Sequence, residues 1–115
     1  MAGPSVQATA SGRRLVARVS GEMAYVNAPV FRPQLKELIA QNDRFIVLDL
    51  SGISYCDSAG LNVLLGAWRQ ADAGGAVLAL ACVPDFLRGT LQLTGADQVL
   101  RVYDTVTNAE AVFGG

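Results

Sequence analysis

The sequence predicts an α/β fold, with a small, mixed and mostly parallel β-sheet of four to five strands covered by about four α-helices. Residues 45–48 and 76–81 are continuously apolar rather than alternating. Strands that are buried on both faces have this pattern, and they usually run parallel beneath covering helices. The 115 residues, 51% of them hydrophobic, suffice for one core, so we expect a single domain spanning residues 1–115.

Three further segments complete the expected sheet. Residues 14–19 mix polar and apolar side chains, which favours a strand nearer an edge. Residues 99–102 predict a short strand, and residues 5–9 an additional one.

The clearest helix covers residues 58–73. Its apolar side chains follow the i, i+3, i+4, i+7 spacing and therefore share one face: Leu61, Leu64, Leu65 and Trp68. We expect Trp68 to pack the helix on the sheet rather than stack on a ligand. The glycine pair at 74–75 ends the helix, because the chain there needs a residue at positive φ.

Three other helices are predicted. The first has Asn27 as N-cap and an apolar face of Phe31, Leu35, Leu38 and Ile39. Pro33 lacks the N–H for a helical bond to residue 29, so this helix either kinks or begins near Arg32. Pro84 opens a third helix that ends at 94–95, and a last helix follows residues 104–105 with Val106, Ala109 and Phe113 inward.

Composition excludes several classes of function. The net charge is -1 and no window clusters Lys or Arg, which argues against nucleic-acid binding. The longest apolar run, 76–83, is far shorter than the ~20 residues of a membrane-spanning helix, so no membrane insertion is expected. The first residues lack a secretory signal, which predicts a cytoplasmic protein with reduced cysteines. Cys56 and Cys82 lack metal-ligand spacing and are expected near the core; no metal or cofactor is predicted.

Residues 47–61 run from the buried strand, through a polar loop, onto the helix whose first residue is Ser58. As a hydrolase nucleophile, Ser58 would need Gly at position 56, where the chain has Cys56, and an activating base. The sequence contains no histidine, so an enzyme is disfavoured. A helix cap, formed by Asp57 or Ser58, and a phosphoacceptor at the helix N-terminus remain open, and the residues alone favour the cap.

Five short motifs together resemble one known family. They cover nearly the whole chain, and the most specific is the third: Gly21-Glu22-Met23, Asn27-Ala28-Pro29, Asp57-Ser58-Ala59-Gly60-Leu61, Leu93-Thr94-Gly95 and Val102-Tyr103-Asp104. The family is the STAS domain, which comprises anti-sigma factor antagonists and the cytoplasmic tails of sulphate transporters.

The resemblance implies a STAS-like fold and a binding function. An antagonist of this type binds an anti-sigma factor that is also a serine kinase, frees a sigma factor, and is switched off when the kinase phosphorylates the motif serine, here Ser58. A serine phosphatase would reset the switch. The implied partner-binding residues are Gly21, Glu22, Met23, Ala24, Asn27, Asp57, Ser58, Ala59, Gly60 and Asn62. The alternative is a stand-alone STAS binding subunit of a transporter or other signalling complex, without regulation by phosphorylation.

Two details keep alternatives open. Antagonists of the family usually have aspartate at the position of Ala24 and often threonine at that of Asn27. Loss of the carboxylate is expected to affect recognition by a typical kinase, and the alternative is a module that binds without being phosphorylated. The small size of Gly60 has two equal explanations, the approach of a partner backbone or close packing against a neighbouring loop.

Overall fold

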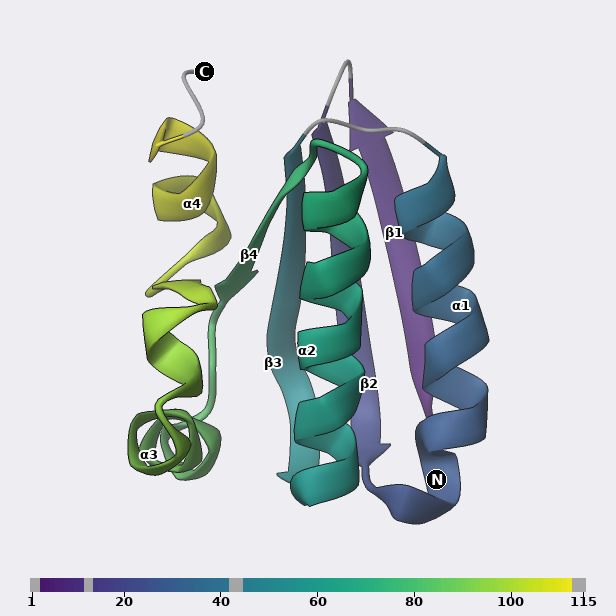
Figure 1. Cartoon of the computed structure of the whole chain (residues 1–115), viewed down its shortest axis with the longest axis vertical. Helices are drawn as coiled ribbons and strands as arrows, with labels where there is room; N and C mark the ends of the chain where they lie inside the picture. Colours follow the sequence, from purple (N-terminus) through teal and green to yellow (C-terminus); the bar gives the residue numbers. More distant parts are fainter. Residues whose placement is uncertain (1–2, 12–13, 42–44, 113–115) are drawn as a thin grey trace.

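The computed structural model describes residues 3–11, 14–41 and 45–112 of the chain. In this part of the chain, five strands form one sheet in the order β1-β2-β3-β4-β5 (Figure 1). The strands are β1 (Ser5–Ser11), β2 (Arg14–Met23), β3 (Phe45–Cys56), β4 (Val77–Ala81) and β5 (Arg101–Tyr103). The helices are η1 (3₁₀, Tyr25–Asn27), α1 (Ala28–Ala40), α2 (Ser58–Ala73), α3 (Asp85–Thr94), η2 (3₁₀, Ala96–Gln98) and α4 (Val106–Val112). The predicted fold class is confirmed.

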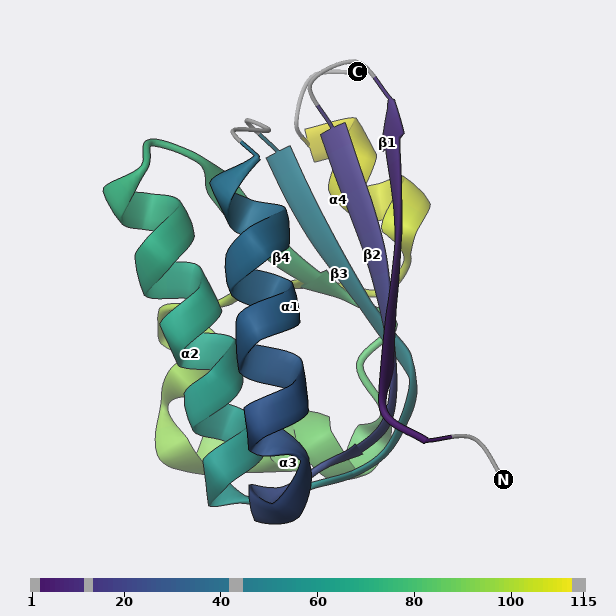
Figure 2. The same ribbon diagram turned by 90° about the vertical axis from the view of Figure 1, so that its right-hand side faces the viewer.

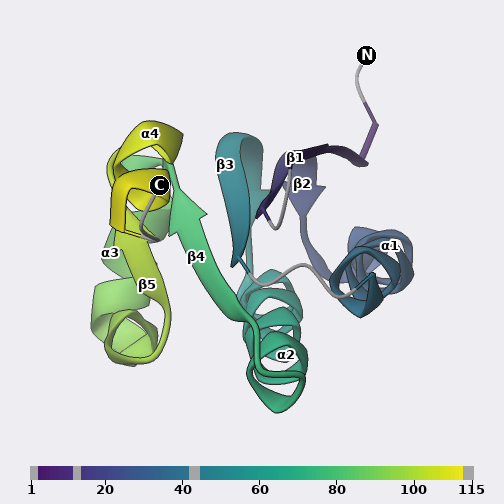
Figure 3. The same cartoon turned by 90° about the horizontal axis from the view of Figure 1, so that it is seen from above.

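The sheet is mostly parallel. Only β1 runs antiparallel to its neighbour, and the other three pairings are parallel. Parallel neighbours need crossover connections, and the crossovers place α1 and α2 side by side on one face of the sheet (Figure 2). Helix α4 lies on the opposite face (Figure 3). The two continuously apolar segments are the interior strands β3 and β4, as predicted.

Strand β2 is not at an edge, which corrects one prediction. Strand β1 takes the edge position and pairs along most of β2. The mixed pattern of residues 14–19 has another cause: Leu15, Ala17 and Val19 are buried beneath the helices, whereas Arg18 on the opposite face is exposed.

Strands β2 and β3 extend past β4. Strand β3 pairs with β4 only as far as Asp49, and its remaining residues continue beside β2 up to the pair Met23 and Cys56, with two register shifts. The predicted polar loop before Ser58 is therefore wrong, because residues 50–56 belong to the strand. This two-stranded extension carries η1 and the first turn of α2 (Figure 1).

Helix α1 begins at Ala28, so of the two predicted alternatives the start near Arg32 is wrong, and Pro33 lies inside the helix. The irregular turn lies before it, in η1, where the Ala24 carbonyl accepts the N–H groups of Asn27 and Ala28 at 2.9 and 3.0 Å.

The remaining elements differ by a residue or two from the prediction. Pro84 is the N-cap of α3 rather than its first residue, and Gly95 ends α3 at φ 75°. Strand β5 starts at Arg101, two residues later than expected. In α4, Ala109 is buried as predicted, whereas Phe113 lies outside the described residues.

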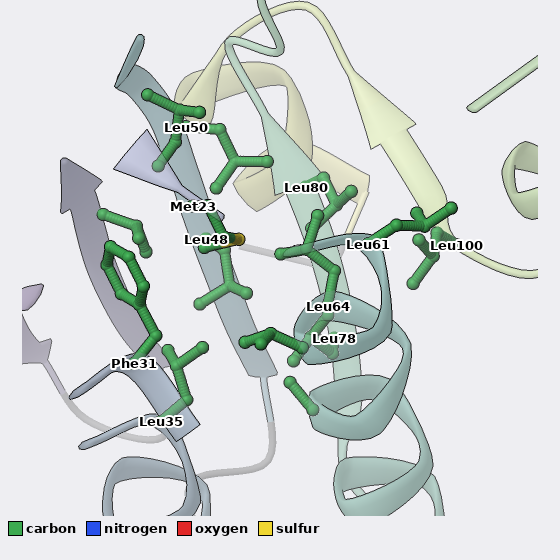
Figure 4. Close-up of a cluster of buried hydrophobic side chains, with 14 of the residues drawn as sticks. Met23, Phe31, Leu35, Leu48, Leu50, Leu61, Leu64, Leu78, Leu80 and Leu100 are labelled. Carbon is green, nitrogen blue, oxygen red and sulfur yellow. The ribbon is translucent and has the colours of Figure 1, made fainter. Parts of the chain in front are cut away.

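The main core lies between the sheet and helices α1, α2 and α3 (Figure 4). Helix α2 has the predicted bounds, and Gly75 follows it at φ 79°. Its buried face is rotated from the predicted one: it consists of Gly60, Leu61, Val63, Leu64, Ala67 and Ala71. Leu65 and Trp68 are half-buried at its margin, where they pack against the core.

Both cysteines are free. Cys56 belongs to the main core, as predicted, and Cys82 is half-buried beside a smaller cluster that α4 covers. Among the described residues, no helix combines the length and apolar character needed to cross a bilayer.

Candidate functional site

The carboxylate of Asp57 joins two segments that are distant in sequence. Its Oδ1 accepts the backbone N–H of Gly60 at 3.0 Å, and its Oδ2 accepts that of Tyr25 at 3.1 Å. The first bond caps α2 and the second holds η1 against the helix start. Asp57 rather than Ser58 is therefore the N-cap of α2, and Ser58 is the first residue of the helix.

Gly60 explains how closely the helix approaches strand β2. A Cβ at this position would overlap the Met23 carbonyl oxygen and would lie 2.9 Å from the Cys56 sulfur. Gly60 itself is buried. Of the two explanations for the small size of Gly60, close packing is therefore the one that the structure supports.

The hydroxyl-bearing residue Ser58 is exposed at the end of the two-stranded extension. Its neighbours Ala59 and Asn62 are half-buried and exposed, respectively. Because Asp57 caps α2, the hydroxyl of Ser58 is not needed as the cap.

The segment from Gly21 to Asn27 borders this helix start. Glu22 is exposed, Gly21, Ala24 and Asn27 are half-buried, and Met23 is buried in the core. Asn27 occupies the N-cap position of α1 but does not cap it; its Nδ2 donates to the Glu22 carbonyl at 2.8 Å instead. Of the ten residues predicted to bind a partner, Met23 and Gly60 are buried, whereas the other eight are exposed or half-buried around this helix start.

The electrostatics follow from the hydrogen bonds. The N–H of Gly60, then that of Tyr25, hold the pKa of Asp57 below its usual value of 3.8. A lowered pKa means that the stabilisation is fully present above pH 3.8 and is lost as the pH falls through the folded-state pKa. Burial, with a smaller contribution from Asp57, raises the pKa of the Cys56 thiol to about 11, so Cys56 stays protonated and unreactive at neutral pH.

Sequence reasoning missed the exposed apolar residues around the site. In η1, Tyr25 is 80% and Val26 67% exposed, and in the first turn of α1 Val30 is 37% exposed. Tyr55, two residues before Asp57, is 52% exposed. The available signal was their position next to the motifs: Tyr25 and Val26 lie between the motifs at 21–23 and 27–29, Val30 follows the second of these, and Tyr55 precedes the motif that begins at Asp57. Exposed aromatic side chains beside a polar centre are typical of protein interfaces.

Within the described ranges, no group of three or more potential metal ligands occurs. The full sequence has no histidine to act as a base for Ser58.

The comparisons with known proteins agree with this picture. The sequence model of the STAS domain matches residues 5–109. The "Anti-sigma F factor antagonist" of Paenibacillus polymyxa is 30% identical over 96 residues, which cover 83% of this chain and 82% of that protein.

Solved structures show the same fold. An anti-sigma factor antagonist from Mycobacterium paratuberculosis superposes with a TM-score of 0.86 at 23% identity, covering 96% of this chain and 93% of the other. The Bacillus cell fate determinant SpoIIAA in its phosphorylated form has a TM-score of 0.70 at 21% identity, with 94% and 99% coverage. A sulfate transporter family protein from Wolinella succinogenes has a TM-score of 0.77 at 21% identity, with 90% and 87% coverage.

The matched region includes all five strands and most of α4. Anti-sigma factor antagonists of this family are regulatory binding proteins and not enzymes. The predicted resemblance is thus confirmed, and the chain belongs to the STAS domain family.

Proposed function

We propose that this protein is an anti-sigma factor antagonist: it binds an anti-sigma factor that is a serine kinase, frees a sigma factor, and is switched off by phosphorylation of Ser58. The observation that carries the proposal is the exposure of Ser58 at a helix start that Asp57 already caps. The antagonist name of the 30% identical relative supports the partner class. A phosphorylated form of SpoIIAA, which has the same fold, supports the modification. Because sigma factors act on RNA polymerase, we place the protein in the cytoplasm, with a serine phosphatase as the resetting enzyme.

The switch would act through local charge. A phosphate adds about −1.5 to −2 charges at pH 7, and a helix N-terminus tolerates an anion. Asp57 already occupies the N–H of Gly60, so the phosphate would point away from the helix rather than replace the cap. Two adjacent anions would then face the partner, and binding would be lost by repulsion while the fold stays intact.

The proposed contact surface consists of the accessible residues around Ser58. It includes Glu22, Ala24, Asn27, Ala59 and Asn62, and we add the exposed apolar side chains of Tyr25 and Val26. Aromatic residues at the centre of an interface commonly contribute most of the binding energy.

The test compares two substitutions at Ser58. Ser58→Asp is expected to weaken binding to the anti-sigma factor at least about tenfold, because like charges across an interface cost several kcal/mol, whereas Ser58→Ala should bind like the parent. Both variants should melt close to the parent temperature, since an anion at this position adds only ~0.3–1 kcal/mol of stability. Isothermal titration calorimetry with the anti-sigma factor encoded nearest the gene provides the measurement. Equal affinities of the two variants would contradict the proposed switch.

A second prediction concerns Ala24. We expect Ala24→Asp to speed phosphorylation of Ser58 by the anti-sigma kinase, because it restores the carboxylate usual in the family. Aspartate at position 24 would stabilise η1 as its N-cap, but its negative charge would lie near that of Asp57 and be repelled by it. We expect the two effects to cancel, so that the free energy of unfolding changes by less than ~0.5 kcal/mol.

Transfer of radiolabelled phosphate from ATP, followed over time, compares the two proteins, with Ser58→Ala as the unlabelled control. If the parent is labelled as fast as the variant, Ala24 has no consequence. If neither accepts phosphate, a STAS module that binds without being phosphorylated becomes the better proposal.

The likeness to the sulfate transporter family protein supports a second candidate, a STAS subunit that docks on a transporter. Its distinguishing result would be co-purification with a permease, with affinity unchanged by Ser58→Asp. The antagonist remains the better proposal because the 30% identical relative has that name.

A further inference from the structure

A groove of about 180 Å³ runs between α1 and α2 on the face away from the sheet. Arg32 and Lys36, one turn apart, form its α1 side. Asn62, Gly66 and Gln70, also spaced by one turn, form its α2 side. Helices α1 and α2 lie side by side over this length (Figure 1).

The groove is basic at its rim and apolar at its floor. Both Arg32 and Lys36 are exposed, and within the described ranges neither forms a salt bridge. The buried side chains of Leu35 and Val63 lie below them. Among the described residues that line the groove there is no carboxylate. The site thus offers two unpaired cations above an apolar strip.

Gly66 leaves open space on the α2 side of the groove. Glycine inside a helix is less favourable than alanine, and a Cβ at Gly66 would meet no atom of the chain within 4 Å. Packing within the protein therefore does not require glycine here. Its effect is to keep the α2 side of the groove low, which leaves room for a side chain from another molecule.

The groove is continuous with the surface around Ser58. Asn62 belongs to both: it lines the groove and lies one turn after the serine. At the other end, Gln70 closes the groove by donating its Nε2–H to the Lys36 carbonyl at 2.9 Å. A partner that covers Ser58 reaches the open end of the groove first.

We propose that the groove binds an acidic segment of the anti-sigma factor, with two carboxylates paired to Arg32 and Lys36 and an apolar side chain seated over Leu35 and Val63 beside Gly66. The inference rests on the proposed function and names the part of the partner that lies beyond Ser58. The charge complementarity would speed association and set the orientation of the complex.

The test measures binding of the full-length anti-sigma factor to the full chain by calorimetry at about 50 mM and about 300 mM NaCl. The double variant Arg32→Glu/Lys36→Glu is expected to weaken binding about tenfold at the lower salt, and less at the higher salt. The control Arg69→Glu/Arg101→Glu changes the net charge equally at exposed positions outside the groove and should bind like the parent.

A second variant separates binding from folding. Gly66→Gln should fill the groove and weaken binding about tenfold, while its better helix propensity raises the melting temperature by about 2–5 °C. Gly89→Gln is the matched control, because a Cβ at Gly89 in α3 also meets nothing within 4 Å. It should raise the melting temperature without changing affinity.

The outcomes distinguish the two proposals. If the groove variants bind like the parent while Ser58→Asp does not bind, the groove proposal is overturned and the proposed function stands. Equal losses in the groove variants and their controls also overturn it. If the parent does not bind the anti-sigma factor, both proposals fail.

Discussion

Replacing Gly60 by alanine is expected to lower the free energy of unfolding by about 3 kcal/mol. The added methyl group would overlap the Met23 carbonyl oxygen and press on the Cys56 sulfur at 2.9 Å. Backbone cannot move aside as a flexible side chain can, so α2 would have to shift away from β2. The gain in helix propensity, about 1 kcal/mol, offsets only part of this cost. Urea titration of the parent and the variant provides the measurement.

The matched control is Gly66→Ala in the same helix, where the new Cβ meets nothing within 4 Å. That substitution should stabilise the protein by up to about 1 kcal/mol. The same chemical change should therefore have opposite signs at two positions six residues apart. A stabilising effect at both positions would show that α2 does not approach Met23 as closely as the structure has it.

The Gly60 result also bears on how binding data are interpreted. The Asp57 cap requires the N–H of Gly60 in its present position, and the same carboxylate holds Tyr25. A shifted helix would break both bonds and displace Ser58. Loss of partner binding by a Gly60 variant would thus report a moved surface rather than a lost contact.

Features set by neighbouring residues could be predicted from the sequence. The bounds of α2 follow from the spacing of its apolar residues and from Gly74 and Gly75, so they were predicted correctly. The interior strands were predicted because continuous apolar segments need cover on both faces. The exposure of Ser58 follows from its place at the start of that helix.

Features that depend on distant residues could not be predicted. The end of β3 contains polar residues, and it is a strand because β2 pairs with it through two register shifts. The choice between Asp57 and Ser58 as cap depends on where Tyr25 lies, and the reason for Gly60 depends on the Met23 carbonyl. None of these contacts leaves a periodic pattern in the sequence.

The buried face of α2 also depends on distant residues and could not be predicted from the sequence. The expected face ran through Leu61, Leu64, Leu65 and Trp68, but the helix is rotated so that Val63, Ala67 and Ala71 point inward. Helix α1 packs against α2 on one side, and Ala67, whose side chain is small, lines the groove between the two helices. A pattern of large apolar residues does not show where a neighbouring helix will lie.

Leu64→Ala should therefore destabilise the protein more than Leu65→Ala, with losses of about 3–4 and about 1–2 kcal/mol. Leu64 is 0% exposed and lies in the main core among the strands and α2 (Figure 4), so its truncation leaves a cavity that the packed surroundings cannot fill. Leu65 is half-buried at the margin, where water and neighbouring side chains can occupy the space. Urea titration of both variants, with equal m-values as a check on two-state unfolding, measures the difference. A loss for Leu65→Ala that equals or exceeds that for Leu64→Ala would show that Leu65 belongs to the buried face, as expected from the sequence.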